Sequence, residues 1–463
     1  MKRKLLAACM AATFALTSLT GCGGSNENAQ DTTQQKTDTT DTAETTETVD
    51  TAEAEKEDTG SAEKIHLTVP KVGYNQDQIN TANAKEGGPT YEDKYYMTVT
   101  ENIAKNLPDY EMEYVDWGWG ETLDQKQRAL FAAGSAPDIV AGETFIPSYA
   151  AEGLLEPLPQ EIVDLVNPSF LVYDNDGKAV AVAYKTSIFM IFYNKALLEQ
   201  CGYSEDDIPT TWDEWKAMSD DITAQGQGEF WGGGIPTFPH AGGALRATPF
   251  FRANGTDFAV DGKINLDDEK LQEVLSFIRE MNYNFPAGLG NGTDEFPMWD
   301  AFHEGSIAFV VQGSFEGADA ETAGMDWGVA PIPMNDSGID GNCTVGSVYL
   351  AVPKDAANKE ASFNVIKEAL SLENEKVWLE GSYCPAIKEI IEDPSYYEND
   401  KVLMMEMQVI KDGTYSGLAT FPKNDSSIWE IINQNVLART TMTEDPIDVI
   451  CSEAQEQIVP LQQ

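Results

Sequence analysis

The sequence predicts an α/β protein whose folded part has two lobes, each a mainly parallel sheet with flanking helices. Two observations lead to this prediction. Segments with apolar residues at helical spacing alternate along the chain with short, continuous apolar runs typical of buried strands. The part from about Lys64 to Gln463 is also long for one hydrophobic core, and its apolar and aromatic content is ordinary.

The first lobe is predicted from a strand at residues 65–69 and a helix at residues 91–107, where Tyr96, Val99 and Ile103 recur at helical spacing. The pattern then repeats along the chain. Its further elements are a strand at 111–115, a helix at 121–133 that ends at Gly134, and a short buried strand at 137–141. A strand-helix-strand-helix-strand order of this kind favours a parallel sheet with right-handed crossovers.

The second lobe is predicted to begin with a buried strand at residues 188–193, followed by a helix from Asn194 that ends at Gly202. Thr211 and Glu214 have the spacing of a capping box, in which each side chain bonds a free backbone N–H of the next helix. We therefore expect Trp212 and Trp215 to pack within that helix.

Later parts of the second lobe carry similar signals. Asp267 is the expected N-cap of a helix, Ser427 and Glu430 match a second capping box, and residues 307–311 form an apolar strand. Helices and buried strands alternate to the end of the chain.

Metal sites and cofactors are not expected from these residues. The turns at Asp174–Gly177 and Asp261–Gly262 resemble calcium loops, but Asp-Gly between extended segments is the usual hairpin signal. The three histidines lie far apart in the sequence. Export would permit a disulfide without requiring one, and the candidates are Cys201, Cys343, Cys384 and Cys451.

The N-terminus reads as an export signal that ends at a lipid-attachment cysteine. Basic residues precede an apolar run too short and too interrupted to span a membrane, so residues 1–21 are expected to be removed. Residues 19–22, Leu-Thr-Gly-Cys, resemble the bacterial lipobox, which implies that Cys22 is acylated. An ordinary secretory signal is the alternative. Residues 22–63 are polar and acidic after Cys22, and we expect a disordered tether.

The charge balance limits the possible partners. The formal net charge is −47, spread over the body as well as the tether, without a basic cluster. This argues against nucleic acid and against anionic lipid as binding partners, and it disfavours anionic ligands. Solubility outside the cell is a sufficient reason for the acidic surface.

Several segments, taken in order, resemble one protein family. They are GSAPDIV (134–140), AEGLLEPL (151–158), YNK (193–195), IPTTWDE (208–214), FHEGSIAF (302–309), WGVAPIP (327–333), VYLAVPK (348–354) and GSYCP (381–385). The chain resembles the extracellular solute-binding proteins of ABC importers, family 1, the group that includes maltose-binding protein. The resemblance implies a type II periplasmic-binding-protein-like fold with three hinge crossings, near residues 186–188, 345–347 and Pro385.

The same resemblance implies lobes of residues 64–186 with 347–384, and of 187–346 with 385–463. It implies a monomer, lipid-anchored on the outer face of the bacterial cytoplasmic membrane, that captures a carbohydrate and passes it to an ABC permease. Catalysis is not expected.

Candidate ligand contacts follow from the rule that ligands lie beyond the carboxyl ends of parallel strands. Aromatic rings stack on sugar C–H faces while acids and amides bond hydroxyls, so carbohydrate fits these residue types. The candidates are Tyr74, Asp116, Trp117, Trp119, Glu143, Phe145, Trp231, Ser314, Phe315 and Glu316. Trp299 and Arg252 remain open, and His240 is more typical of a loop.

Two other functions remain open from the sequence. A surface glycoside hydrolase needs two carboxylates about 5 to 9 Å apart, and Asp116 with Glu316 is a conceivable pair. An acidic, aromatic cleft would also suit a polyamine or another non-sugar solute.

Overall fold

The computed structural model describes residues 64–293, 295–336 and 343–463. The expected signal peptide, the lipobox with Cys22 and the tether lie outside these residues. By its internal contacts the chain divides into two units, Met1–Gly60 and Ser61–Gln463. Every feature below belongs to the second unit.

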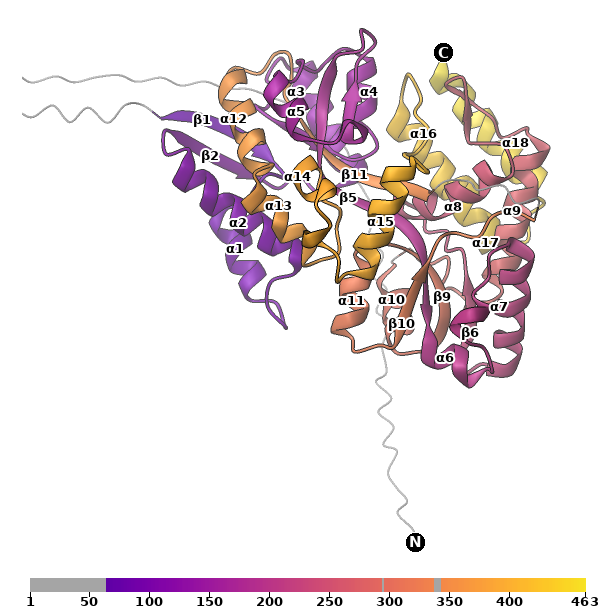
Figure 1. Cartoon of the computed structure of the whole chain (residues 1–463). Helices are drawn as coiled ribbons and strands as arrows, with labels where there is room; N and C mark the ends of the chain where they lie inside the picture. The colour runs from indigo at the N-terminus through magenta and orange to yellow at the C-terminus, as the bar shows by residue number, and fades with distance from the viewer. Residues whose placement is uncertain (1–63, 294, 337–342) are drawn as a thin grey trace, which may run out of the picture. The chain divides into compact units, whose positions relative to one another are not determined.

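The described residues form strands and helices in alternation (Figure 1). The strands are β1 (Ile65–Pro70), β2 (Tyr110–Val115), β3 (Val140–Gly142), β4 (Leu171–Tyr173), β5 (Ala179–Asn194), β6 (Trp231–Gly234), β7 (Ala259–Val260), β8 (Lys263–Ile264), β9 (Ile307–Gly313), β10 (Trp327–Ala330), β11 (Cys343–Ala351) and β12 (Tyr415–Ser416). The first helices are α1 (Gln76–Asn83), α2 (Tyr91–Asn106), α3 (Gly120–Ala132), α4 (Ile146–Ala151), α5 (Gln160–Leu165), α6 (Lys195–Gln200), α7 (Trp212–Gly226), α8 (Ala241–Ala253) and α9 (Glu269–Asn282). They are followed by α10 (Phe296–His303), α11 (Glu316–Thr322), α12 (Lys359–Ala369), α13 (Leu372–Leu379), α14 (Lys388–Glu392), α15 (Lys401–Asp412), α16 (Asp425–Ile431), α17 (Arg439–Met442) and α18 (Ile447–Ile458).

Strand β5 connects the two lobes. It is 16 residues long and buried along nearly all its length, with mostly apolar residues on either side of Lys185, Thr186 and Ser187. Its first half pairs with β11, with Thr186 opposite Ser347, and its second half pairs with β9, with Ile191 opposite Val311. We call β1–β4 with α1–α5, α12 and α13 the first lobe, and α6–α11, β6–β10 and α15–α18 the second lobe.

The strand pairing corrects the expectation of a mainly parallel sheet in each lobe. Parallel pairs occur between β1 and β2, β6 and β9, and β11 and β12. Strand β5, however, is antiparallel to each of its partners β4, β9, β10 and β11. The reason is connectivity, because β11 brings the chain back alongside the strand on which it left the first lobe.

Most predicted elements are confirmed, including the parallel pair β1 and β2 and the helices α2 and α3. The capping box of Thr211 and Glu214 starts α7, and Trp215 is fully buried behind it. Two of the predicted helix N-caps were wrong. Helix α9 is capped by Asp268 rather than Asp267, and α16 starts at Asp425, so that Ser427 lies inside the helix.

The hairpin interpretation of the two Asp-Gly turns is confirmed. Asp174–Gly177 joins the antiparallel strands β4 and β5, and Asp174 accepts bonds from the turn's own N–H groups. Asp261 and Gly262 join β7 and β8 with φ of 52° and 71°, which suits a two-residue turn. Of the cysteines in the described part, Cys201, Cys384 and Cys451 are free thiols.

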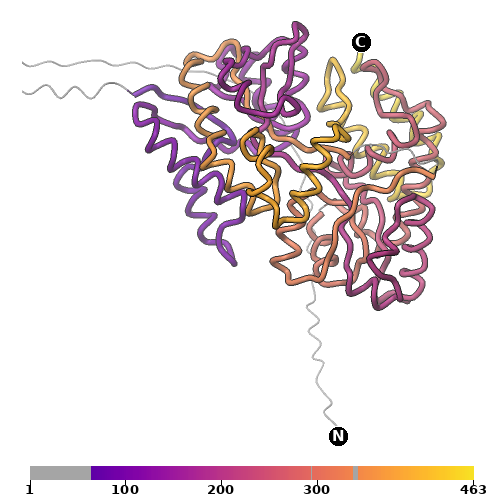
Figure 2. Tube along the Cα trace, in the orientation of Figure 1, coloured from indigo at the N-terminus to yellow at the C-terminus, as the bar shows by residue number. Residues whose placement is uncertain are grey.

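Late segments of the chain complete the first lobe. The tube trace shows orange segments lying against the indigo start of the chain (Figure 2), and Asn102 of α2 bonds Asn374 of α13 at 2.7 Å. Trp378 of α13 is fully buried, and its ring stacks on Tyr95 of α2 with centroids 4.1 Å apart. These contacts fix α13 to the lobe that α2 began.

Three chain segments meet where the hinge was expected. Thr186 of β5 faces Ser347 of β11, with 3.1 Å between their hydroxyl oxygens, and Cys384 donates its N–H to the Thr186 carbonyl at 3.0 Å. Beyond Pro385, Ala386 still accepts from Asn167 of the first lobe at 3.0 Å. The third segment therefore remains in contact with the first lobe past Pro385.

Two buried carboxyl groups hold these segments. Glu406 of α15 accepts the N–H of Ile188 at 2.9 Å, and Glu375 of α13 accepts the N–H of Ala386 at 2.7 Å. Both side chains are fully buried, and burial raises the pKa of each well above its usual value. Burial thus disfavours the ionised form of each carboxyl, while each still accepts a backbone bond.

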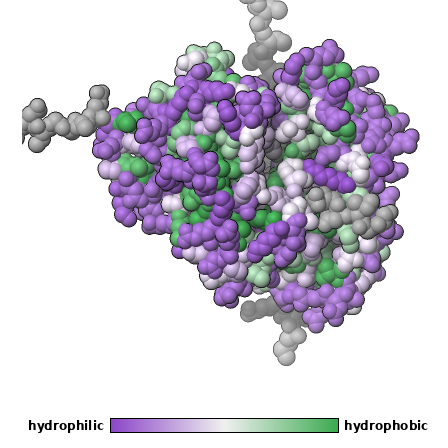
Figure 3. All heavy atoms as spheres, turned by 45° about the horizontal axis from the view of Figure 1, so that its top comes forward, coloured by the Kyte–Doolittle hydropathy of each residue, from purple (hydrophilic) through white to green (hydrophobic). Residues whose placement is uncertain are grey.

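The surface is mostly polar in the space-filling view, with apolar residues in separate patches (Figure 3). None of the helices within the described ranges is both long enough and apolar enough to cross a membrane.

We expect Trp378→Ala to lower the free energy of unfolding by about 3–5 kcal/mol, because removing a large buried ring leaves a cavity. Urea unfolding followed by circular dichroism measures this loss. Tyr283→Ala is the control, since Tyr283 is 62% exposed and surface changes usually stay within about 0.5 kcal/mol. Equal losses in the two variants would contradict the packing described for α13.

We expect the stability of the protein to fall as pH rises above the ordinary carboxyl range, and Glu406→Gln to reduce that fall. A carboxyl whose pKa is raised by folding contributes stability below its unfolded pKa and loses it as pH rises through its folded pKa. Glutamine keeps an acceptor for Ile188 but cannot ionise. Urea midpoints from about pH 4 to about pH 8 measure the effect.

Glu456→Gln is the control, because Glu456 is exposed and should leave the pH dependence unchanged. Parallel curves for wild type and Glu406→Gln would show that Glu406 does not ionise over this range.

Candidate functional site

A cavity of about 610 Å³ lies between the two lobes and over the hinge strands, within the size range of small-molecule sites. Its walls from the first lobe include Trp119, Glu121, Glu143, Thr144 and Phe145. Its walls from the second lobe include Phe189, Pro239, His240, Leu245, Arg246, Glu295, Phe315, Trp429, Glu430, Asn433 and Gln434, and its floor includes Lys185, Ser187, Val345–Tyr349 and Tyr383. We call this space the cleft cavity.

Two of the predicted residues that follow strand β3 line the cleft cavity. Strand β3 pairs with β11 at the hinge, so the residues after it, Glu143 and Phe145, line the cleft cavity. Burial raises the pKa of Glu143, and the nearby Lys185 opposes this effect. A carboxyl at this position suits a ligand hydroxyl.

Trp119 is the residue after β2 that reaches the cavity. It precedes α3, its side chain is 39% exposed, and the Lys71 ammonium lies 4.1 Å from the centre of its ring. The other two candidates after β2, Asp116 and Trp117, do not line the cavity. Asp116 bonds Lys71 at 3.2 Å and the N–H of Gly118 at 3.0 Å, and Trp117 packs against the core near Phe145.

Tyr74 lies away from the cavity, although it follows strand β1. Its hydroxyl donates to Asp93 at 3.0 Å, and its ring packs on Tyr96 with centroids 5.0 Å apart. Strands β1 and β2 form a separate two-stranded sheet, so their carboxyl ends do not adjoin the hinge as the end of β3 does.

The residues after β9 point in different directions. Phe315 lines the cavity and packs against Tyr383, with ring centroids 5.6 Å apart. Ser314 is buried, and its N–H donates to Ser187 at 3.1 Å. Glu316 is fully buried, with its carboxylate 2.7 Å from the His303 ring. Ser314 and Glu316 therefore support the wall without lining it.

Trp231 does not line the cavity. It begins β6 and lies opposite Ile307, the first residue of β9, so it stands at the amino ends of both strands. The turn after the carboxyl end of β6 lines the cavity instead, through Pro239, His240 and Gly242. The strand-end rule would have found this turn had it been applied to β6.

Arg246 was not predicted, and it forms part of the wall of the second lobe. It projects from α8, donates to the Val311 carbonyl at 2.9 Å and to the Gly242 carbonyl at 2.8 Å, and bonds Gln312. Its guanidinium also pairs with Glu295 at 2.9 Å. No sequence signal marked it, because its partners come from distant strands and turns.

Lys185 of β5 lies on the floor, beside the hinge. Its ammonium is 3.3 Å from Glu92 and 4.6 Å from the centre of the Tyr383 ring. Burial by itself lowers the pKa of Lys185, but Glu92, Tyr383 and Glu143 together outweigh burial and hold the pKa above its usual value. The expected hinge at residues 186–188 was the signal that could have identified this floor.

Trp429 of α16 is one of several aromatic residues of the cavity that were not predicted from the sequence, with Phe189, Tyr349 and Tyr383. It lines the cavity, and its indole N–H donates to the Ala419 carbonyl at 3.0 Å. It was overlooked because Ser427–Glu430 was read as a helix cap. The π-helical turn Ile432–Ala438 follows α16 and presents Asn433 and Gln434 to the cavity, a type of turn that is frequent at functional sites.

Of the remaining candidates, Arg252 and Trp299 have structural roles, while His240 lines the cavity. Arg252 pairs with Asp257 at 2.8 Å, and Trp299 packs on Phe315 behind the wall. His240 stacks on Phe238, with centroids 5.6 Å apart. The described residues contain no cluster of three or more acidic, histidine or cysteine side chains arranged to hold a metal ion.

Comparison with known proteins follows this geometry. Residues 98–404 match the family "Bacterial extracellular solute-binding protein". The maltotriose-binding protein of Pyrococcus abyssi is 23% identical over 322 residues, which cover 66% of this chain and 66% of that protein. The arabinooligosaccharide-binding protein of Halalkalibacterium halodurans is 21% identical over 289 residues, 59% of this chain and 63% of that protein. The matched stretch thus spans just under two thirds of either relative.

Solved structures share the two-lobed fold. Maltose-bound MalE3 of T. maritima superposes with a TM-score of 0.68 at 20% identity, over 86% of this chain and 99% of that one. The GacH receptor of Streptomyces glaucescens gives 0.67 at 21% identity, over 86% of this chain and 98% of that one. Because the family match at residues 98–404 covers more than half of the sequence, the chain belongs to the bacterial extracellular solute-binding proteins.

Proposed function

We propose that this protein captures a neutral carbohydrate, in the form of an oligosaccharide, in the cleft cavity and delivers it to an ABC permease. One observation carries the proposal: aromatic faces and polar side chains line both walls of the same cavity. Trp119 and Phe145 lie on one wall, and Phe315 and Trp429 lie on the other. Rings stack on the apolar faces of sugars, and carboxylates and amides accept or donate bonds to hydroxyls.

The known relatives support a carbohydrate ligand. The two curated relatives bind maltotriose and arabinooligosaccharides by their names, and solved neighbours were crystallised with maltose or acarbose.

A polyamine fits this cavity less well than a sugar does. A polycation needs carboxylates and aromatic faces without competing positive charge. Lys185 on the floor and Arg246 on the wall place two cations in the cavity, and each already pairs with a glutamate. An ammonium group of a polyamine would have to compete with Lys185 and Arg246 for these glutamates, whereas a neutral sugar would not.

Hydrolysis of the ligand is not part of the proposal. The carboxylate pair considered from the sequence does not face one cavity, because Asp116 bonds Lys71 outside the cleft cavity and Glu316 is buried against His303. We propose that ligand binding favours closure of the lobes and that the closed form engages the permease.

We propose lobes of residues 64–186 with 347–384 and of 187–346 with 385–463, with one refinement. Lys388 donates to the Asp164 carbonyl at 2.8 Å, and Ala386 bonds Asn167. The third crossing therefore falls after α14 rather than at Pro385.

The test is calorimetric titration of the mature protein with maltotriose, an arabinooligosaccharide, mannotriose and spermidine. We expect an oligosaccharide to bind and Trp119→Ala to weaken that binding about tenfold, the effect of losing about 1.4 kcal/mol of stacking. Trp231→Ala is the matched control, because Trp231 lies outside the cleft cavity. Binding of spermidine alone, or release of shorter sugars during incubation, would overturn the proposal.

The family is extracellular, and we further propose that Cys22 carries the lipid that holds the protein at the cytoplasmic membrane. Two acyl chains are enough for stable anchoring where one is marginal. We expect the wild type to partition into the detergent phase of a Triton X-114 extract and Cys22→Ser to move to the aqueous phase. An unchanged distribution would indicate an ordinary secretory signal.

We expect the mature protein to act as a monomer.

A further inference from the structure

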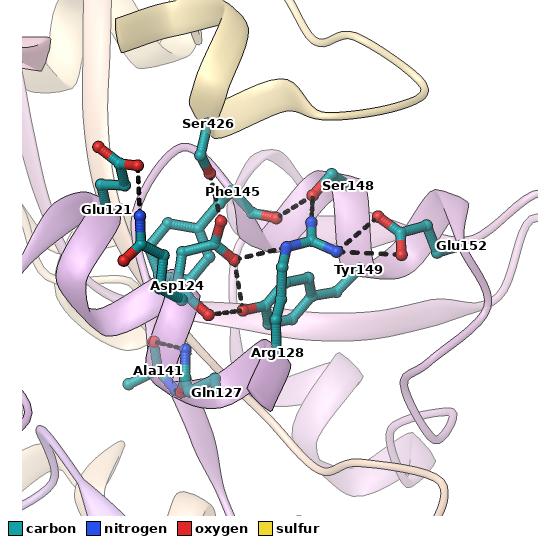
Figure 4. Close-up of polar contacts among 11 residues, drawn as sticks. Glu121, Asp124, Gln127, Arg128, Ala141, Phe145, Ser148, Tyr149, Glu152 and Ser426 are labelled. Atoms are coloured by element: carbon teal, nitrogen blue, oxygen red, sulfur yellow. Dashed lines mark hydrogen bonds and ion pairs between the residues drawn. The ribbon is translucent and has the colours of Figure 1, made fainter. Parts of the chain in front are cut away.

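The two lobes also touch at the rim of the cleft cavity, through α3 of the first lobe and α16 of the second. Ser426 of α16 donates its hydroxyl hydrogen to Asp124 of α3. Figure 4 shows the Ser426 side chain pointing from its helix toward the carboxylate of Asp124. This bond joins residues that are 302 positions apart in the sequence, and Ser426 itself lines the cleft cavity.

Asp124 is held rigidly in place for this contact. Its other carboxylate oxygen accepts from the Tyr149 hydroxyl at 2.6 Å and from Arg128 at 2.9 Å. Arg128 is fixed in turn by Glu152 at 3.0 Å and by Ser148 at 2.9 Å (Figure 4). The side chain of Asp124 is only 4% exposed. The first lobe therefore presents a preorganised acceptor, and the donor comes from the other lobe.

A pair of acids lies beside this bond. Glu121 of α3 and Glu430 of α16 both line the cleft cavity, and their carboxyl groups lie within hydrogen-bonding reach of each other. Two ionised carboxylates repel at this separation, whereas one shared proton turns the contact into a hydrogen bond. Burial is the main cause that raises the pKa of Glu121, and the neighbouring Glu430 raises it further.

A second cavity of about 390 Å³ adjoins the contact and holds another unusual acid. Asp425 lines it and is fully buried; one carboxylate oxygen accepts the Phe421 N–H at 2.7 Å, and the other has no hydrogen-bond partner. Burial, together with Asp124 across the contact, raises the pKa of Asp425 to about 7. Bringing the lobes together thus places the carboxylate of Asp124 near the buried carboxyl group of Asp425.

We propose that α3 and α16 form a proton-dependent latch across the rim of the cleft cavity, in which acid closes the lobes over the ligand and alkali loosens them. The proposal rests on the proposed function, since it treats the two lobes as the halves that shut around a solute.

The charged groups around the latch determine whether acid or alkali favours the closed form. Glu121 faces Asp124 on its own helix and Glu430 on α16, while Arg128, Glu152 and Lys423 surround the second cavity. In the open form Glu430 moves away from Glu121, and the pKa of Glu121 returns toward its ordinary value. The closed form therefore binds more protons than the open form, so closure strengthens as pH falls from the raised pKa values toward the ordinary carboxyl range.

Hydrogen–deuterium exchange on the ligand-free mature protein tests the latch without knowledge of the ligand. After correction for intrinsic exchange rates, we expect the amides of α3 and α16 to be about two- to fivefold better protected at about pH 5 than at about pH 8. Glu430→Gln removes the repulsion with Glu121 and should therefore increase protection at the higher pH, leaving only the pH effect of Asp425 beside Asp124. Ser426→Ala removes the bond to Asp124 and should reduce protection at both.

Glu456→Gln is the control, an exposed acid on α18 away from the latch. Equal protection in wild type and Glu430→Gln at both pH values would overturn the latch. A second arm measures maltotriose affinity by calorimetry at the same two pH values, with about two- to fivefold tighter binding expected in acid. If exchange depends on pH but maltotriose does not bind, the latch is supported and maltotriose is not the ligand. If maltotriose binds but neither exchange nor affinity depends on pH, the latch is refuted and the proposed function is not.

Discussion

The architecture depends on the antiparallel pairing of β5 and β11 through the hinge. Strand β5 pairs with β11 in its first half and with β9 in its second half, so one continuous strand belongs to both lobes. An extended strand bonded on both sides resists stretching and shear but permits some change of twist. The two lobes can therefore move as bodies while the floor between them keeps its register. Thr186, opposite Ser347, marks the centre of this floor.

The hinge and the cleft cavity are parts of one arrangement. The strands that join the lobes also supply the cavity floor, through Lys185, Ser187 and the segment Val345–Tyr349. The carboxyls of Glu406 and Glu375 hold the crossing segments from behind, and each accepts a backbone N–H that would otherwise be buried without a partner. Burial disfavours a charge on these two acids, and a protonated carboxyl can accept the bond without leaving an uncompensated charge in the interior.

The cleft cavity combines rigid and variable elements. Its aromatic faces come from both lobes, so a ligand that touches Trp119 and Trp429 at once links the lobes and favours the closed form. Arg246 is held by carbonyl groups and by Glu295, which leaves it little freedom to follow a ligand. At the rim, the bond between Ser426 of α16 and Asp124 of α3 joins the two lobes directly.

The sequence by itself determined the local elements, the two-lobed fold and part of the site. Apolar periodicity placed β1, α2 and α3 closely, and the strand-end rule found Glu143, Phe145 and Phe315, because these signals lie within a few consecutive residues. Only the tertiary structure decided the rest. It decided that β5 is antiparallel to its partners, that Tyr74 and Trp231 lie away from the cavity, and that Lys185, Arg246 and Trp429 line it. Those outcomes depend on pairing between segments up to hundreds of residues apart. A local sequence pattern does not specify which distant strand will pair with a given strand.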